Sequence, residues 1–109
     1  MLYLSSQDFF DKASECICLS CEEELRCAEL MKNGDAEARQ RIINSYIPFV
    51  ASFVRRHSGK NPSLQFIYRC LQALEKQVDS FDFLYERDRF IHTLSLVLRK
   101  EVTGKIIGP

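Results

Sequence analysis

The sequence lacks tryptophan and has few turn-forming residues, with four glycines and three prolines in 109 residues. Such a shortage of helix breakers favours long helices over a many-stranded sandwich, which needs frequent turns. No run of apolar residues is long enough to cross a membrane. The opening residues, MLYLSSQDFF, carry Asp8 and no basic residue, so we expect no signal peptide. We therefore expect an all-α, cytoplasmic protein without a membrane segment.

The hydrophobic fraction of 46% excludes disorder as the default, and the length suits a single domain spanning residues 1–109. The most informative stretch is residues 32–59, KNGDAEARQRIINSYIPFVASFVRRHSG. Asn33-Gly34 ends one helix, Asp35 is placed to cap the next, and Gly59 offers a C-terminal stop. These signals predict one helix of about six turns.

Apolar residues along this helix recur every three or four positions and form a face too wide for one neighbour. They are Ile42, Ile43, Tyr46, Ile47, Phe49, Val50, Phe53 and Val54. We therefore expect the helix to be central. Pro48 removes one backbone hydrogen bond, but the apolar pattern keeps its phase, which favours a kink near Asn44 over a break.

Two short helices precede this one and two longer helices follow it. Residues 6–17 place Phe9, Phe10 and Ala13 on one side, and a capping box formed by Ser20 and Glu23 opens a helix that ends at Lys32. Its expected apolar side is Leu25, Ala28 and either Leu30 or Met31.

After Gly59, Asn61 is the expected cap and Pro62 the first residue of a helix that ends at residues 80–82. Its core stripe is Leu64, Ile67, Leu71, Leu74, Val78 and Phe81, and its other side carries Phe66, Tyr68, Arg69, Cys70 and Gln72. Phe66 and Tyr68 belong either to the core or to an interaction surface. A last helix, residues 85–103, is expected to bury Phe90, Ile91, Leu94, Val97, Leu98 and Val102 and to expose Arg89, His92, Leu96, Lys100 and Thr103.

Charge is unevenly distributed although the formal net charge is zero. Residues 1–37 carry nine acids and three bases, or −6, which leaves six acids and twelve bases, or +6, for residues 38–109. A basic body suits nucleic acid or an acidic partner, and the acidic flank is able to screen or mimic that partner. The alternative is two solvated faces of opposite sign.

Four of the five cysteines, Cys16, Cys18, Cys21 and Cys27, fall within twelve residues, and four thiolates are enough for a zinc site. Cys21 and Cys27 lie in one predicted helix on different sides, and the total is odd. Reduced thiols that pack as small hydrophobes are therefore favoured over a metal or disulfides, and Cys70 is interpreted as packing.

Catalytic patterns are absent from the sequence. His57 and His92 have no carboxylate or cysteine partner at a useful spacing, and no glycine-rich phosphate loop or nucleophile motif is present. We expect a protein that is not an enzyme and has no cofactor.

Several segments together resemble bacterial RNA polymerase sigma factors of the sigma-70 family, regions 1.2 and 2. They are LSCEEEL (residues 19–25), KNGDAEAR (32–39), SYIPFVASFVRRH (45–57) and ALEKQVDSFD (73–82). The resemblance covers residues 19–106, without regions 3 and 4. It implies a helical bundle of about five helices, with region 1.2-like helices in residues 1–33 and a region 2-like three-helix core in residues 35–106.

The chain departs from the family at functional positions. Where the family has D-L-I-Q-E-G facing the clamp helices of the polymerase β′ subunit, this chain has QFIYRC (65–70), which replaces acids by Gln65 and Arg69. Where the family has promoter-melting aromatics, it has IHTLSLVLRK (91–100), which offers no indole or phenol for a flipped base. Phe90 and Arg99 persist. These departures fall at the positions that the family uses for polymerase docking and for promoter melting.

Three functions follow from these observations. The first is a sigma region 2 that binds core RNA polymerase and, weakly when alone, promoter DNA in transcription initiation. The resemblance implies polymerase contacts at Gln65, Tyr68, Arg69 and Gln72, and DNA contacts at Arg55, Arg56, Arg87, Arg89, Arg99, Lys100 and Thr103. The second is a sigma-like module that has lost promoter melting and acts as a regulator or assembly partner. It would use Phe66, Tyr68 and Leu71 as an apolar contact surface, with an anti-sigma factor or another regulatory protein as its candidate partner. The third is a helical interaction domain whose resemblance is architectural only.

Overall fold

The computed structural model describes residues 2–59 and 61–107, with side chains as far as residue 102. Five helices of nine residues or more make up most of this part: α1 (Ser6–Ser14), α2 (Cys21–Lys32), α3 (Ala36–Ser58), α4 (Leu64–Ser80) and α6 (Phe90–Ile107). A short turn, α5 (Phe83–Glu86), and a 3-10 turn, η1 (Arg87–Arg89), connect α4 to α6. These residues include no strand, so the all-α prediction is confirmed.

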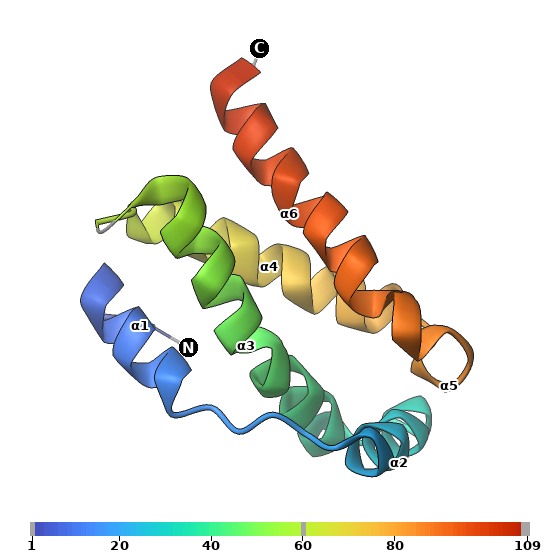
Figure 1. The fold of residues 1–109 in the computed structure, drawn as a ribbon. Coiled ribbons are helices and arrows are strands. Elements are labelled where there is room, and N and C mark those ends of the chain that lie inside the picture. Colours follow the sequence, from blue (N-terminus) through green and yellow to red (C-terminus); the bar gives the residue numbers. More distant parts are fainter. Residues whose placement is uncertain (1, 60, 108–109) are drawn as a thin grey trace.

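Helix α3 occupies the centre of the bundle. It packs against α1, α2 and α4, while α6 lies along α4 (Figure 1). The helix continues through Pro48, so the prediction that the chain does not break there is confirmed. Both predicted end signals are present: the Asp35 side chain accepts a hydrogen bond from the Ala38 amide at 3.0 Å, and Gly59 has a φ of 73°.

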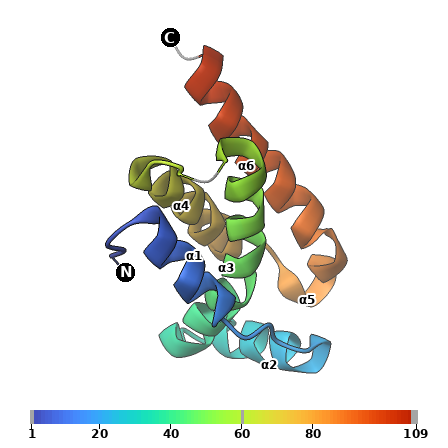
Figure 2. The same ribbon diagram turned by 60° about the vertical axis from the view of Figure 1, so that its left-hand side comes forward.

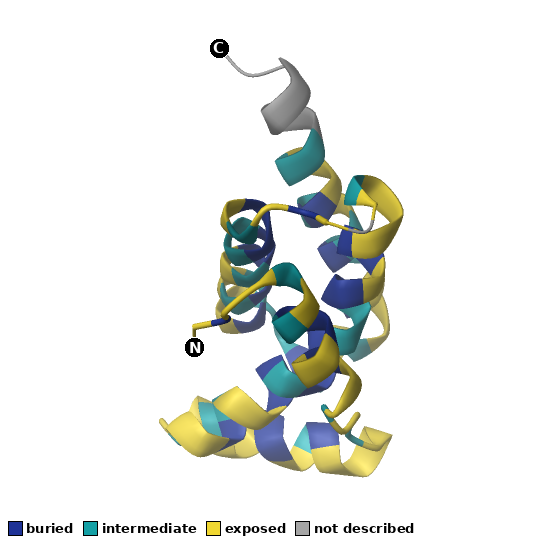
Figure 3. Ribbon diagram, turned by 90° about the vertical axis from the view of Figure 1, so that its left-hand side faces the viewer, coloured by how far each residue is buried: buried dark blue, intermediate teal, exposed yellow. Residues whose placement is uncertain are grey.

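The core lies where α3 and α4 face each other, and α1 and α6 extend it on either side. Figure 3 shows the buried residues on the inner sides of these helices and exposed residues outside. The largest side chains in the core that are fully buried are Phe9, Phe83, Phe90, Ile42, Ile67, Leu74, Leu94 and Leu98. Burial of Phe9, Phe10 and Ala13 on α1 confirms the predicted inner face of that helix.

Helix α1 ends earlier than predicted, at Ser14, and residues 16–20 cross to α2 without regular structure (Figure 2). The predicted capping box of Ser20 and Glu23 is confirmed, with both hydrogen bonds present. Of the two alternatives predicted for the apolar side of α2, Met31 packs against the core, whereas Leu30 is 43% exposed. Glu24 and Cys27 are also buried, beside Ala28, on the face that contacts α3 and α5.

The predicted start of α4 is wrong by two residues. Ser63 is the cap, because its hydroxyl accepts a hydrogen bond from the Phe66 amide at 3.1 Å, and the helix begins at Leu64. Pro62 is buried before the helix and is not its first residue. Asn61 is exposed and does not cap it.

The predicted helix over residues 85–103 is divided among three elements, the end of α5, η1 and α6. The Asp82 carboxylate accepts a hydrogen bond from the Leu84 amide at 3.1 Å and so caps the separate turn α5. Within α6, Phe90, Leu94 and Leu98 are buried as expected, at a spacing of four residues. Ile91 was expected to be buried but is 41% exposed, because it lies beside this narrow seam rather than on it.

Candidate functional site

Four residues of α4, predicted to contact polymerase, share one face of the helix. Gln65, Tyr68, Arg69 and Gln72 follow the spacing of three and four that places side chains on the same side. Gln65 and Gln72 are exposed, whereas Tyr68 and Arg69 are half-buried. We call these four residues the α4 face.

Burial along α4 shows which of its apolar residues belong to the core. Phe66 is 2% exposed and Cys70 is fully buried, so the apolar and basic mixture expected on the outer side is divided between the core and the surface. Tyr68 lies at the boundary, where its hydroxyl accepts a hydrogen bond from the Tyr3 amide at 2.7 Å. No sequence pattern indicates this contact, which joins residues 65 positions apart.

Arg69 connects α4 to α6. Its Nε lies 3.6 Å from a carboxylate oxygen of Glu101, and its terminal Nη2 donates to the Glu101 carbonyl at 3.4 Å. The guanidinium also lies 5.9 Å from the centre of the Phe66 ring. Both charged side chains remain more than one third exposed, so the pair contributes little to stability and a competing partner has access to it.

Three of the predicted DNA contacts, Arg89, Arg99 and Lys100, lie on α6 or directly before it. Arg89 is the last residue of η1, and His92, Leu96, Arg99 and Lys100 lie within about 100° around the axis of α6; all five residues are exposed. Arg89, Arg99 and Lys100 make no ion pair with the residues that the structure describes. We call these five residues the α6 face. Thr103, predicted beside them, lies outside the residues whose side chains are described.

Arg55 and Arg56 lie far from the N-terminal end of the α6 face. They are exposed in the last turn of α3, and the C-terminal end of α3 and the start of α6 lie at opposite ends of the bundle (Figures 1 and 2). The Arg55 guanidinium is centred 4.4 Å from the Phe10 ring, an arrangement typical of a cation–π contact. This contact ties Arg55 to α1.

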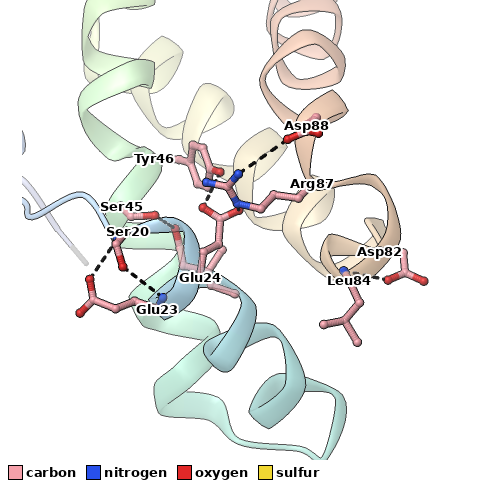
Figure 4. Close-up of polar contacts among 10 residues, drawn as sticks. Ser20, Glu23, Glu24, Ser45, Tyr46, Asp82, Leu84, Arg87 and Asp88 are labelled. Carbon is pink, nitrogen blue, oxygen red and sulfur yellow. Dashed lines mark hydrogen bonds and ion pairs between the residues drawn. The ribbon is translucent and has the colours of Figure 1, made fainter.

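Arg87 takes part in a buried polar cluster with Glu24 and Tyr46. The Tyr46 hydroxyl donates to one Glu24 carboxylate oxygen at 2.8 Å, and Arg87 Nε lies 3.1 Å from the other (Figure 4). The Glu24 side chain is only 4% exposed and that of Arg87 29%. Burial, followed by the hydrogen bond to Glu24, raises the pKa of the Tyr46 phenol. The phenol is therefore a neutral donor to a carboxylate.

This cluster fixes the point at which α6 begins. Glu24 belongs to α2, Tyr46 to α3 and Arg87 to η1, so three segments meet at one carboxylate. The Tyr46 ring also packs against Phe90, the first residue of α6, with ring centres 4.6 Å apart. The sequence analysis did not single out Glu24. Its helical spacing from Cys27 and Ala28 was the available signal.

The other candidate features carry less chemistry. Cys16, Cys18, Cys21 and Cys27 are free thiols; Cys27 and Cys70 are buried, whereas Cys18 and Cys21 are exposed. Within the described residues, no three His, Cys, Asp or Glu side chains are grouped as a metal site would require. No helix in that part of the chain is long and apolar enough to cross a membrane.

Comparison with known proteins identifies a similarity to a sigma factor. The chain is 36% identical over 66 residues to the RNA polymerase sigma factor SigA of Clostridium acetobutylicum. The match covers 60% of this chain but 18% of that protein, so the chain spans less than a fifth of the relative. No family model matches the chain. No solved structure matches it. The chain therefore contains a sigma-factor-like region, and the similarity extends no further than that.

Proposed function

We propose that this chain is a sigma-like module that docks on bacterial core RNA polymerase through the α4 face and approaches promoter DNA with the α6 face. It acts by binding rather than by catalysis. The observation that carries the proposal is the α6 face itself, where Arg89, Arg99 and Lys100 are exposed and have no carboxylate partner in the described part of the chain. Unpaired cations along one helix suit a phosphate backbone, and the similarity to SigA supports the choice of partner.

A second function, regulation without promoter melting, is favoured by the side chains of that same face. Its single large apolar residue is Leu96, 45% exposed, and its only aromatic group is the His92 imidazole, so it presents no Phe, Tyr or Trp ring on which an unpaired base could stack. Tyr85 is 82% exposed but belongs to α5, where the Lys32 ammonium lies 5.7 Å from the centre of its ring. A module of this kind would bind polymerase or an anti-sigma factor and leave the DNA closed.

Gel filtration of the purified chain with bacterial core RNA polymerase at moderate salt tests docking. We expect a stoichiometric complex, and separate elution of the two would reject the proposal. Arg69→Glu should change the affinity, because it restores the acidic sign of the family at this position. It also faces Glu101 with a like charge, so the double variant Arg69→Glu/Glu101→Arg is the matched control. It restores the ion pair while keeping the acid on α4.

DNA binding is tested separately by fluorescence anisotropy in a salt titration. Each phosphate contact contributes about −0.9 to the slope of log K against log salt, so Arg99→Ala/Lys100→Ala should reduce the slope by about two if both residues contact phosphate. Arg41→Ala removes a half-exposed arginine from α3 and should leave the slope unchanged. Equal slopes for the wild type and the α6 variant would remove this face from the proposal. A single-stranded probe distinguishes the two candidate functions, because the regulatory module gains nothing from unpaired bases.

A further inference from the structure

The segment that precedes α1 lies across the α4 face. Tyr3 is only 6% exposed. Its amide donates to the Tyr68 hydroxyl at 2.7 Å, and its carbonyl lies 3.4 Å from the same hydroxyl, within reach of a hydrogen bond donated in return. The two rings are stacked with their centres 6.1 Å apart. A residue of the proposed docking surface is therefore already occupied by the protein's own chain.

Tyr3 is held from the other side by α1. Its ring meets that of Phe9 edge to face, with ring centres 5.1 Å apart. The next amide, that of Leu4, donates to the Asp8 carboxylate at 2.9 Å, and this hydrogen bond is the main cause that lowers the pKa of Asp8. Leu2 and Leu4 are 85% and 90% exposed, so Tyr3 is the one anchored side chain of residues 2–4. We call these three residues the strap.

The strap also forms one wall of a surface groove of about 410 Å³, whose other walls come from α3 and α4. The lining includes Ile43, Ile47, Leu71 and Gln72, so the groove borders the α4 face directly. Figure 2 shows the N-terminal segment beside α1 and α4. Lifting the strap would uncover the Tyr68 ring and widen the groove toward Leu71.

We propose that the strap is an autoinhibitory cover, which a polymerase must displace from Tyr68 before it docks on the α4 face; this inference rests on the proposed function. The strap suits this role because a single buried side chain anchors it, and segments with few buried contacts open at low cost. Affinity for a partner that needs the open form is reduced by the fraction of molecules that are open. The strap would thus lower the affinity for polymerase without preventing docking.

The test compares three full-length variants in their binding to immobilised bacterial core RNA polymerase. Tyr3→Ala removes the anchor and should bind about five to ten times more tightly than the wild type, as expected when a mostly closed strap is released. Tyr3→Phe should behave as the wild type, because the hydrogen bonds to Tyr68 use the Tyr3 backbone and the ring is retained. Leu4→Ala changes an exposed residue of the same segment and should also leave the affinity unchanged.

Three binding results would contradict the proposal that the strap covers the α4 face. Equal affinity for Tyr3→Ala and wild type would leave docking intact but show that the strap does not oppose it. Weaker binding would show that Tyr3 is part of the docking surface. If no variant binds, the proposed function fails and the cover fails with it.

Hydrogen exchange of the residue 3 and 4 amides separates these cases without polymerase. Both amides should be protected in the wild type and exchange faster in Tyr3→Ala, with the melting temperature confirming that the variant is folded. Unprotected amides in the wild type would refute a closed strap, whatever the polymerase result.

Discussion

Replacing Arg87 with methionine should destabilise the fold by about 2–3 kcal/mol. The change retains an unbranched side chain of similar length but leaves the Glu24 carboxylate, which is 4% exposed, without its cationic partner. Breaking a fully buried ion pair costs about 3–5 kcal/mol. Our estimate is lower because the Arg87 side chain is 29% exposed, so water reaches part of the site, and because Tyr46 still donates to Glu24.

A double-mutant cycle isolates the interaction. Glu24→Gln keeps an oxygen that accepts from Tyr46 and removes the charge, so it should cost about 1–2 kcal/mol. Once that charge is gone, Arg87→Met should cost about 1–2 kcal/mol less than it does alone. Urea denaturation followed by far-ultraviolet circular dichroism is the appropriate assay, because the chain has no tryptophan to report unfolding by fluorescence.

The matched control is an exposed ion pair. Arg39 binds Asp79 through two hydrogen bonds of 2.6 and 2.9 Å, but the carboxylate side chain is 52% exposed, so Asp79→Asn should cost less than about 1 kcal/mol. If Arg87→Met costs no more than Asp79→Asn, the buried cluster does not hold the fold together as argued. Arg87→Met also tests the DNA contact predicted for Arg87 from the sequence. A reduced salt slope in DNA binding without loss of stability would support that role instead.

Four further predictions follow from individual contacts. Burial raises the pKa of Tyr46, so the folded state keeps a proton that the unfolded state loses above about pH 10. The free energy of unfolding should therefore fall as pH rises beyond that point. Tyr46→Phe should reduce this fall, as measured by urea titrations at alkaline pH. The hydrogen bonds from Arg39 lower the pKa of Asp79. The ionised Asp79 therefore adds a small amount to the free energy of unfolding above about pH 4, and this amount is lost as pH falls through the folded pKa. Asp79→Asn should make the free energy of unfolding depend less on pH in this acidic range. Ser20→Ala removes the cap of α2 and should cost about 1 kcal/mol in the same urea assay. Ile42→Ala empties a fully buried position of α3 and should cost about 2–5 kcal/mol, so a smaller loss would mean that the core collapses around it.

The parts of the fold that could be predicted are those fixed by local chemistry. The boundaries of α3 follow from Asp35 and Gly59, because capping and a positive φ depend on residues within one turn. The capping box of α2 was predictable for the same reason. The start of α4 was not, because Asn61 and Ser63 are both good caps and Pro62 is compatible with either choice. Which of the two residues caps α4 depends on where the chain that follows α3 enters the core.

The candidate surfaces were less predictable, since exposure depends on which helices pack on each side. Helix α4 carries apolar residues around most of its circumference, so its sequence could not show that Phe66 is buried while Tyr68 stays at the boundary. Arg87 and Arg89 are alike in sequence, yet only Arg87 lies opposite a buried carboxylate. The strap contact of Tyr3 with Tyr68 leaves no periodic signal at all, because it joins two distant segments through a backbone amide.

The Arg69–Glu101 pair gives the two proposed surfaces an energetic connection. Arg69 belongs to the α4 face, and Glu101 follows directly after Arg99 and Lys100 of the α6 face. While the pair is intact, the cation on α4 offsets the Glu101 charge next to the proposed phosphate contacts. A polymerase carboxylate that drew Arg69 away would leave Glu101 unpaired there, and like charge repels phosphate. Docking through Arg69 and binding of DNA should therefore oppose each other weakly, whereas docking through Gln65 and Gln72 should not. Glu101→Gln removes that opposition, so the effect of polymerase on DNA affinity in this variant, compared with the wild type, shows which residues of the α4 face the polymerase engages.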